Sequence, residues 1–389
     1  MSPSDRHCDA LIVGAGPAGT HLAWLLAARG IDVAIIERQD FPRDKVCGGG
    51  VSRKALELLG IDLGPVVQKT IRGAVLSWRN ETATVKDMTP PAACTVLRSE
   101  FDDFLLRRAC GAGARFHPAT AFVDLREAAA GLVVATDRGE FRCRRLFAAD
   151  GANSAVRDRV FGRGLVHYVP ALEALVQLDD EALARFGDRA VFDFAGTANG
   201  YGWIFPKRDH ANVGVYSPFG GRGLRASLEA LMARYAPLRG AGRVDYRGWI
   251  VPLANCRDEY ARGRVSLLGD AAGLAEALFG EGIYFALRSA QLAAQAVTES
   301  GLDNGGERYC ELLRRQLCPE LRTARRMAGL LYRVPQFSFR HLVLNERIND
   351  DFAGLISGTM SYRRCLRRTL AGFPRWLLPS RPPGPAPTL

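Results

Sequence analysis

"ALIVGAGPAGTHLAWLLAA", residues 10–28, is an uncharged stretch whose three glycines have the spacing GxGxxG. Four apolar residues precede the first glycine, and a second apolar run, "DVAIIE", follows at residues 32–37. This order predicts a strand, a glycine turn, a helix and a second strand. The stretch is almost as long as a membrane-spanning helix, but the turn inside it and the apolar run after it favour a βαβ unit.

Each glycine of this turn has its own mechanical role in binding a dinucleotide. Gly14 permits the tight turn, Gly16 lets a pyrophosphate approach the backbone, and Gly19 lets the helix pack closely on the strand. The phosphates then lie at the helix N-terminus, where free N–H groups favour negative charge. Glu37 closes the second strand, where its carboxylate is expected to accept hydrogen bonds from ribose hydroxyls.

The composition is that of a globular enzyme. The chain has 389 residues, of which 48% are hydrophobic and 24% charged, so it is long enough to bury a cofactor. Its formal charge of +11 indicates surfaces that attract anions. No nucleic-acid recognition fold accompanies this charge, so we expect no nucleic-acid partner.

The cysteines and histidines do not indicate a metal site. Nine cysteines are spread through the chain without a CxxC pair, and the six histidines form no cluster at ligand spacing. No segment suited to secretion is apparent. We therefore expect reduced thiols, most of them small core residues, in a cytoplasmic protein without a metal or iron–sulfur group.

Two later segments have glycine-acid pairs. "RLFAADGANSAVR", residues 145–157, contains Asp150-Gly151, and "RVSLLGDAAGLAEALFGEGIYFALRSAQLAAQAV", residues 264–297, contains Gly269-Asp270 before a long helix that begins near Gly282. With the first glycine turn, this order of motifs resembles the FAD-dependent oxidoreductases of the p-hydroxybenzoate hydroxylase fold. The resemblance covers roughly the first 300 residues. It implies an α/β (α+β) fold with a Rossmann-type FAD-binding domain.

The resemblance also implies a cofactor site. Asp270 would meet a ribose hydroxyl, Gly280 to Gly282 would lie near the pyrimidine end of the flavin, and Arg98 would contact the flavin from a helix start. The other interpretations are a surface arginine for Arg98 and an ordinary turn at Asp150. Relatives commonly have proline where this chain has Ala277. The implied site comprises Gly14, Gly16, Pro17, Ala18, Gly19, Glu37, Arg38, Cys47, Gly48, Gly49, Arg98, Asp150, Gly151, Gly269, Asp270, Gly280, Gly282 and Ile283.

A second glycine cluster, "KVCGGGVSRK" at residues 45–54, places one thiol beside three glycines. In this fold the segment is expected to pass beside the flavin ring, and glycines let the backbone approach a flat ring or a substrate. "KVCGGGVS" and "YGWIFPK", residues 201–207, together look most like the geranylgeranyl reductase family, which has a CGGG-type loop and a YxWxFP segment followed by two glycines. Here Gly214 is present and Tyr216 replaces the second glycine.

This family resemblance implies a substrate site and two candidate proton donors. Cys47 and Tyr201 are the candidate catalytic residues, although Cys47 is equally interpreted as a small buried hydrophobe. The aromatic segment is either a cavity wall or a plain core strand. The expected substrate-binding residues are Gly49, Gly50, Tyr201, Trp203, Phe205 and Tyr216.

The domains are expected to interleave in sequence. Residues 1–71, 94–165 and 262–305 are assigned to the FAD-binding domain, within which residues 119–149 form a three-stranded meander. Residues 72–93 and 166–261 are assigned to an antiparallel-sheet substrate domain. Residues 306–389 are assigned to a C-terminal helical region with a proline-rich tail.

One C-terminal helix is amphipathic. In "YRRCLRRTL", residues 362–370, apolar positions share one face and four arginines the other. Trp376, Leu377 and Leu378 follow. Either the apolar stripe packs on the protein's own domain, or the helix contacts an anionic membrane.

The chain has one dinucleotide fingerprint, because "GGRGLRASLEAL" at residues 220–231 lacks GxGxxG. Electrons are therefore expected from transiently docked NADPH or from a reduced protein donor. The resemblance implies a reductase that saturates carbon-carbon double bonds of a prenyl lipid or another hydrophobic molecule by hydride transfer from flavin N5. The alternatives are a flavin monooxygenase or halogenase of the same fold, and a flavin electron carrier to a quinone.

Overall fold

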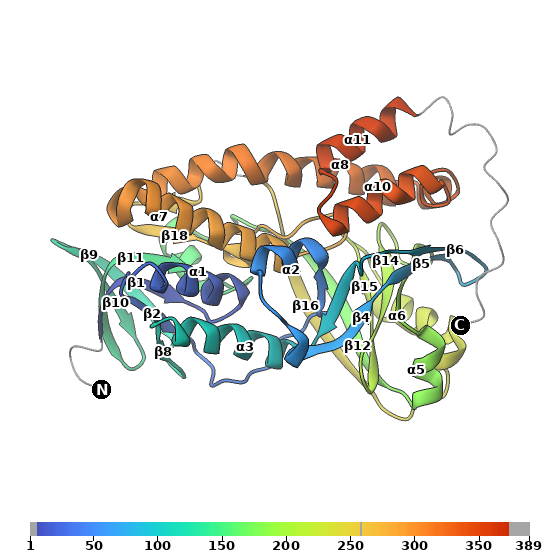
Figure 1. The fold of residues 1–389 in the computed structure, drawn as a ribbon, viewed down its shortest axis with the longest axis horizontal. Coiled ribbons are helices and arrows are strands. Elements are labelled where there is room, and N and C mark those ends of the chain that lie inside the picture. The colour runs from blue at the N-terminus through green and yellow to red at the C-terminus, as the bar shows by residue number, and fades with distance from the viewer. Residues whose placement is uncertain (1–5, 257–258, 373–389) are drawn as a thin grey trace.

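The computed structural model describes residues 6–256 and 259–372. Two sheets lie side by side, and the C-terminal helices form a layer along the upper edge of the view (Figure 1). The first sheet has eight strands, joined by four parallel and three antiparallel pairings. They are β17 (Ala261–Arg262), β18 (Val265–Leu267), β11 (Gly139–Ala148), β1 (His7–Val13), β2 (Val33–Ile36) and β8 (Arg115–His117) in spatial order, with β10 (Gly131–Thr136) and β9 (Phe122–Ala128) continuing from β11.

The predicted strand, turn, helix and strand are confirmed as β1, α1 (Pro17–Ala27) and β2. Gly14 has a φ of +102°, and a Cβ there would overlap the Ala149 carbonyl group. A Cβ on Gly19 would overlap the Gly14 carbonyl oxygen. These two glycines therefore permit the close packing of α1 against β1 and β11. The meander predicted for residues 119–149 is also confirmed, because β9, β10 and β11 pair antiparallel in sequence order.

Smaller elements join the two large sheets. A three-stranded sheet has the order β3 (Gly50–Ser52), β7 (Ala93–Val96) and β4 (Val67–Ile71). The helices beside it and around the first sheet are α2 (Arg53–Leu59), η2 (Gly64–Val66), α3 (Arg98–Gly111) and α4 (Ala155–Phe161).

The second large sheet has seven strands, drawn from residues 73–87 and 167–253. Their spatial order is β16 (Val244–Leu253), β12 (His167–Gln177), β15 (His210–Tyr216), β14 (Tyr201–Pro206), β13 (Arg189–Asp193), β5 (Gly73–Trp78) and β6 (Thr82–Asp87). The sheet is not purely antiparallel as predicted, since β13 and β5 pair parallel. Strand β5 comes from a segment far earlier in the chain, so no hairpin sets its direction. The helices of this region are α5 (Asp180–Phe186), α6 (Leu224–Arg234) and η3 (Ala236–Leu238).

The remaining described chain is largely helical. A short turn, η4 (Gly269–Ala272), precedes the long helix α7 (Ile283–Leu312), which is kinked at Gly301. The following elements are η5 (Leu313–Leu317), α8 (Cys318–Arg333), α9 (Pro335–Ser338), η6 (Phe339–Val343), α10 (Glu346–Ser357) and α11 (Tyr362–Ala371). None of the helices in residues 6–256 and 259–372 combines the length and apolar character needed to cross a membrane.

The apolar stripe of α11 packs on the protein itself. Tyr362, Cys365 and Thr369 are buried, and the Tyr362 N–H donates to Glu320 on α8 at 2.6 Å. Arg368 pairs with the buried Asp351 on α10 at 2.8 Å. Of the two interpretations of this helix, packing on the protein's own domain is therefore the correct one. Trp376, Leu377 and Leu378 lie outside the described residues.

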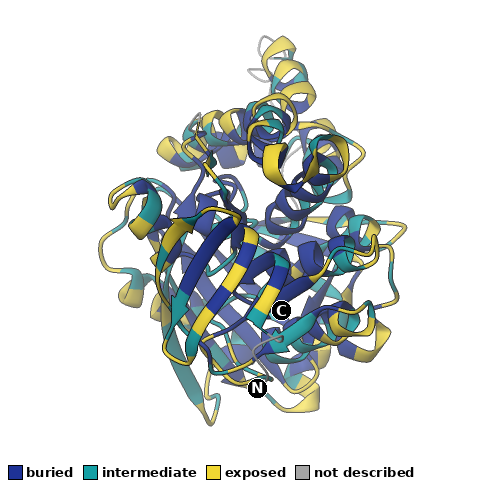
Figure 2. Cartoon of the chain, turned by 90° about the vertical axis from the view of Figure 1, so that its left-hand side faces the viewer, coloured by how far each residue is buried: buried dark blue, intermediate teal, exposed yellow. Residues whose placement is uncertain are grey.

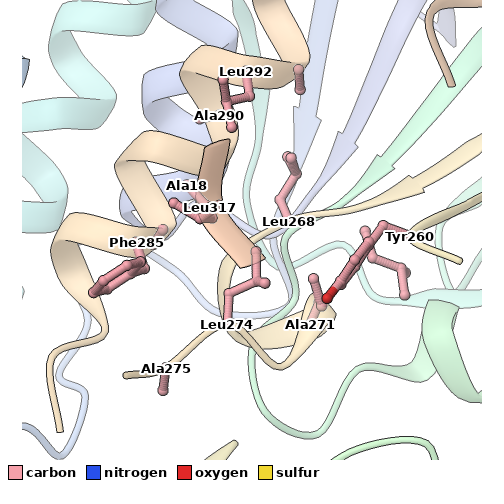
Figure 3. Close-up of a cluster of buried hydrophobic side chains, with 14 of the residues drawn as sticks. Ala18, Tyr260, Leu268, Ala271, Leu274, Ala275, Phe285, Ala290, Leu292 and Leu317 are labelled. Carbon is pink, nitrogen blue, oxygen red and sulfur yellow. The ribbon is translucent and has the colours of Figure 1, made fainter. Parts of the chain in front are cut away.

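The core follows the sheets and the inward sides of the helices, while exposed residues occupy the outer surface (Figure 2). One hydrophobic cluster joins residues 268–275 to α7 and α1 (Figure 3). Leu268, Ala271 and Leu274 lie with Phe285 of α7 and Ala18 of α1 in this cluster. The cluster thereby fixes the position of the Gly269-Asp270 segment relative to the glycine turn.

Candidate functional site

A cavity of about 290 Å³ lies where the first glycine turn, the CGGG loop (residues 45–50) and the seven-stranded sheet meet. Its lining is mostly apolar, as expected for a small-molecule site. Most residues that the sequence pointed to lie around this one cavity. They are Gly16, Pro17, Ala18, Cys47, Gly48, Gly49, Gly50, Arg98, Gly151, Tyr201, Trp203, Phe205, Tyr216, Asp270, Gly280, Gly282 and Ile283.

Six predicted cofactor residues lie outside the lining, namely Gly14, Gly19, Glu37, Arg38, Asp150 and Gly269. Gly269 has a φ of +50° and lies between Ala18 and Ala286, so its role is packing. Glu37 is buried and accepts hydrogen bonds from the N–H groups of Ala15 at 3.0 Å and Gln39 at 3.2 Å. These bonds tie the glycine turn to the end of β2. Arg38 is exposed beyond that strand.

The residues around the glycine turn fit a dinucleotide. A Cβ on Gly16 would find its nearest neighbour, an Arg43 guanidinium nitrogen, only at 3.7 Å, so the backbone there is open to a ligand. The first turn of α1 lies at the same edge, where its N–H groups favour phosphate. Asp150 Oδ1 is buried and has no hydrogen-bond partner in the described part of the chain. Burial raises the pKa of this carboxyl. A bound polar group would satisfy that oxygen.

The turn after Asp150 has a structural brace. Arg157 is buried and donates to the Ala152 carbonyl group at 2.9 Å and to Asp158 at 2.9 Å. Ser154 caps α4 by accepting from the Arg157 N–H at 3.0 Å. Arg157 therefore holds the turn and does not line the cavity.

Charged groups at the cofactor end of the cavity are paired. Asp270 forms an ion pair with Lys45 of the CGGG loop at 3.1 Å. Glu281 pairs with Lys54 at 2.6 Å and accepts a hydrogen bond from Ser52. Lys54 also lies over the Tyr284 ring at 4.6 Å. These contacts fix the CGGG loop against the segment that leads into α7.

The loop before α7 is held by tyrosines. Tyr216, Tyr332 and Tyr201 donate hydrogen bonds to the carbonyl groups of residues 277, 278 and 279, respectively, with distances of 3.2 Å for Tyr216 and 2.6 Å for Tyr201. Glu276 is fully buried and accepts from the N–H groups of residues 278 and 279. These bonds anchor the loop around Ala277.

The same bonds alter the expected role of Tyr201. Its side chain lines the cavity as predicted, but its hydroxyl hydrogen is directed at the Phe279 carbonyl group. Burial raises the pKa of this hydroxyl, and the nearby Glu276 and Glu281 raise it further. A weak acid whose hydrogen is already donated to the backbone is a poor proton source. The structure therefore argues against Tyr201 as the proton donor.

Arg98 is not a surface residue. It begins α3, is buried, and donates two hydrogen bonds to Asp102 at 2.8 and 2.7 Å. Arg43 also pairs with Asp102, at 2.9 Å. Burial opposes the charge of Arg98, but Asp102 and then Cys47 act against it, and the net effect raises the pKa of the guanidinium. A fixed cation thus faces the cavity beside the Cys47 thiol.

The glycines of the CGGG loop contact the protein's own wall. A Cβ on Gly48 would meet Phe205 and Trp203 at 3.2 Å, and one on Gly50 would meet Phe205 at 3.3 Å. Gly49 has a φ of +70°, and a Cβ there would overlap the Val96 carbonyl group. Close packing on β14 and β7 therefore explains these glycines. The approach of these glycines to a flavin ring or a substrate stays a prediction.

The aromatic segment forms the chamber wall and is also well packed. Trp203 lies over Gly214 so closely that a Cβ there would overlap the indole ring, and its Nε1 donates to Asn212 at 2.7 Å. Tyr216 is buried beside Tyr201, with 5.7 Å between their ring centroids. Tyr216 thus fills the space beside Tyr201 in the chamber wall.

Two buried charged residues near the CGGG loop were not predicted as site residues from the sequence. Glu173 on β12 lines the cavity and is 4% exposed. Lys207 is 3% exposed and donates to the carbonyl groups of Gly48 at 3.2 Å and Val96 at 2.7 Å. Burial lowers the pKa of Lys207 to about 8. The position of Lys207 directly after the YGWIFP segment was the one available signal.

The cysteines are mostly buried in the core. All nine cysteines are free thiols, and seven of them are buried. In the described residues no group of three or more histidine, cysteine or acidic side chains is arranged to hold a metal ion. Cys47 is half-buried, and its Sγ accepts from the Gly49 N–H at 3.4 Å.

Comparison with known proteins agrees with this geometry. Residues 7–171 match the FAD binding domain family. The chain is 30% identical over 363 residues to the menaquinone reductase of Mycolicibacterium smegmatis, covering 86% of each chain. It is 30% identical over 331 residues to the chloroplastic geranylgeranyl diphosphate reductase of Oryza sativa subsp. japonica, covering 78% of this chain and 69% of that protein.

Solved structures share the fold. A geranylgeranyl bacteriochlorophyll reductase-like protein from Thermoplasma acidophilum superimposes with a TM-score of 0.78 at 20% identity, over 96% of this chain and 98% of that one. Flavin-dependent halogenases have the same fold at lower identity. The relatives, the matched FAD binding domain and the shared fold establish that this chain belongs to the geranylgeranyl reductase family of FAD-dependent oxidoreductases.

Proposed function

We propose that the protein saturates carbon-carbon double bonds in the isoprenoid chain of a prenyl lipid. The observation that carries this proposal is the continuity of the cavity. Cofactor-binding motifs line one part of it, and an apolar and aromatic wall lines the rest. Besides the aromatic segment, this wall contains Ile71, Ala74, Met88, Ala190, Phe192, Ile250, Val251 and Ile356. Such a surface suits a hydrocarbon chain.

The named relatives support an isoprenoid substrate. One is a menaquinone reductase and another a geranylgeranyl diphosphate reductase. Menaquinone and geranylgeranyl diphosphate differ in their head groups, but both carry an isoprenoid chain. We infer that the chain, and not the head group, is what the apolar wall contacts.

The chain's own residues would hold FAD and exclude water. Gly16 to Ala18 would contact its phosphates, Asp270 a ribose hydroxyl, and Gly280 to Ile283 the pyrimidine end. Arg98 would hold a fixed positive charge beside the ring. When bound and reduced, FAD supplies a hydride for the reaction. The aromatic wall keeps the alkene away from water.

When a hydride adds to one alkene carbon, a proton must reach the other. The proton donor must be close, because an isolated alkene is poorly electrophilic. Cys47 is in the chamber wall and stays a predicted donor. Substitution of Cys47 by alanine would lower alkene turnover with FAD still bound if the thiol supplies this proton. Unchanged turnover would remove Cys47 from the mechanism.

A second candidate function, electron transfer to a quinone head group, is compatible with the name of the mycobacterial relative, a menaquinone reductase. The name of the mycobacterial relative does not say which part of menaquinone is reduced. Anaerobic incubation with menaquinone separates the two functions, because a reduced head group is reoxidised by air and a saturated chain is not. Oxygen-dependent hydroxylation or halogenation of the substrate would instead support a monooxygenase or halogenase.

The electron donor and the cellular location stay predictions. We propose transiently docked NADPH or a reduced protein as donor, and tests with each donor under anaerobic conditions would distinguish them. We also propose a cytoplasmic protein that contacts a membrane peripherally. Co-sedimentation with anionic and neutral lipid vesicles tests this contact, and equal absence from both vesicle pellets would contradict it.

A further inference from the structure

Glu173 occupies an unusual position in the chamber wall. On β12 it is paired with Gly214 of β15 on one side and with Arg247 of β16 on the other. Trp203 of β14 is paired with the same Gly214 from the far side of β15. Because opposed residues of paired strands share a face of the sheet, Glu173 lies on the same face as Trp203 and borders the cavity. Gly214, without a side chain, leaves room for the indole ring between them.

The other charged side chains of the cavity are already paired, and the thiols of Cys47 and Cys94 line it as well. Lys45 pairs with Asp270, Glu281 with Lys54, and Arg98 with Asp102. Tyr201 and Tyr216 donate to backbone carbonyl groups. Glu173 forms no ion pair within 4 Å in the described part of the chain. It is thus a buried cavity carboxyl group without a cation bound directly to it.

The surroundings of Glu173 come from four segments. The Asn212 amide on β15, the backbone of Cys47, the Lys207 ammonium group and the Arg247 guanidinium group each favour its charged form. Arg247 is itself paired with Asp245 and Asp44. Burial outweighs these contacts, so the pKa of Glu173 is raised. A carboxyl group in this environment retains its proton to higher pH than an exposed one.

Lys207 lies between the chamber and the protein surface. Its ammonium group is beneath the CGGG loop, where it bonds to the Gly48 and Val96 carbonyl groups. The same residue borders a second pocket together with Gln68, Asp180 and Arg208. Cys47 and Glu173 both favour the charged form of Lys207, against the effect of burial.

We propose that Glu173, and not Cys47, is the acid that protonates the substrate alkene. The proposal rests on the proposed function. A hydride, which FAD would supply when bound and reduced, forms a C–H bond at one alkene carbon. The π bond breaks, and its electrons form the second C–H bond with the Glu173 proton. The carboxylate then regains a proton from water.

The test compares Glu173→Gln with Glu276→Gln and Cys47→Ala in FAD-loaded, dithionite-reduced protein under anaerobic conditions. Glu276 is a matched control, because it is a buried carboxyl group that does not line the cavity. General acid catalysis contributes about 10²–10⁴-fold, so Glu173→Gln is expected to lower the rate of chain saturation by at least about 10²-fold. It is also expected to remove the loss of rate as the pH rises. FAD absorbance should be unchanged.

Two further readouts separate the outcomes. In the Glu276→Gln background without substrate, infrared spectroscopy is expected to show a protonated carboxyl group that disappears when Glu173 is also replaced. If Glu173→Gln fails to fold, Glu173→Asp is expected to fold and keep the pH-dependent loss of rate with lower turnover. An unchanged rate and pH profile in Glu173→Gln would overturn the proposal. No chain saturation by the wild type would instead contradict the proposed function, and the infrared result would still report on Glu173.

Discussion

The Tyr201 hydroxyl group donates a hydrogen bond to the Phe279 carbonyl group at 2.6 Å, across the space between β14 and the loop before α7. This bond connects the chamber wall to the loop that leads into the cofactor end of the cavity. Since the hydroxyl hydrogen is engaged there, Tyr201 shapes the chamber and anchors the loop.

Replacement of Tyr201 by phenylalanine tests this role. The ring would remain, and the Phe279 carbonyl group would lose its buried partner at a cost of about 1–3 kcal/mol in the free energy of unfolding. We expect FAD binding and turnover to stay within a few-fold of wild type. Tyr332→Phe is the matched control, because Tyr332 bonds the adjacent Leu278 carbonyl group. A large loss of turnover specific to Tyr201→Phe, with stability unchanged, would make Tyr201 the proton donor after all.

The CGGG loop is expected to tolerate no side chain at Gly49. A Cβ there would overlap the Val96 carbonyl group and lie 2.8 Å from Lys207 Nζ, in addition to the strain of a positive φ. Gly60 also has a positive φ, but its nearest neighbour would be 3.9 Å away. We expect Gly60→Ala to cost about 1 kcal/mol and to bind FAD normally. Gly49→Ala should lose FAD binding or fold poorly, and normal FAD absorbance in that variant would contradict the packing described.

Two ion pairs on α3 offer a comparison between buried and exposed partners. Asp102→Asn would leave Arg98 and Arg43 without their carboxylate, and breaking a buried pair costs about 3–5 kcal/mol. Asp103 pairs with Arg107, whose side chain is 79% exposed, and Asp103→Asn should change stability by less than about 1 kcal/mol. Urea unfolding measures both. Equal effects of the two substitutions would show that the Arg98 cluster is not a buried network.

The pH dependence of stability should report on Glu276. Burial raises the pKa of its carboxyl group from the usual 4.5 to about 7. Between these values the folded protein keeps a proton that the unfolded chain has released, so this residue makes the free energy of unfolding fall as the pH rises. Glu276→Gln removes this dependence. Relative to wild type, the variant should therefore gain stability on the order of 3 kcal/mol between pH 4.5 and pH 8.

The exposed Glu57 supplies the control for that titration, since its side chain is 57% exposed. The difference in unfolding free energy between Glu57→Gln and wild type should be nearly constant with pH. A constant difference for Glu276→Gln as well would show that its carboxyl group titrates normally in the folded protein.

The sequence predicted those features that depend on neighbouring residues in the chain. The glycine turn, the meander and the start of α7 follow from local patterns of apolar residues and glycines. Glu173 could not be identified in this way, because a single glutamate in a strand is usually a solvent-facing residue. Its burial depends on Gly214 of β15 and on the CGGG loop, which come from distant parts of the sequence.

The surroundings of α11 and of the CGGG loop also depend on tertiary packing, which the sequence alone does not show. The arginine-rich face of α11 was visible in the sequence, but its apolar stripe is covered by α8 and α10 through contacts to Glu320 and Asp351. The glycines of the CGGG loop were expected to approach a flavin ring. Within the protein their closest neighbours are Phe205, Trp203 and Val96, which no local pattern could have placed there, and the approach to a flavin stays a prediction.

The central claim is tested most directly by mass spectrometry of prenyl lipids after anaerobic incubation with the purified, dithionite-reduced protein. Geranylgeranyl diphosphate and a menaquinone serve as the two substrates, and protein without bound FAD is the control. We predict a yellow protein and a product that gains two hydrogens for each reduced bond in the isoprenoid chain and persists in air. A protein that binds FAD and is reduced, yet leaves both isoprenoid chains unchanged, would contradict the claim.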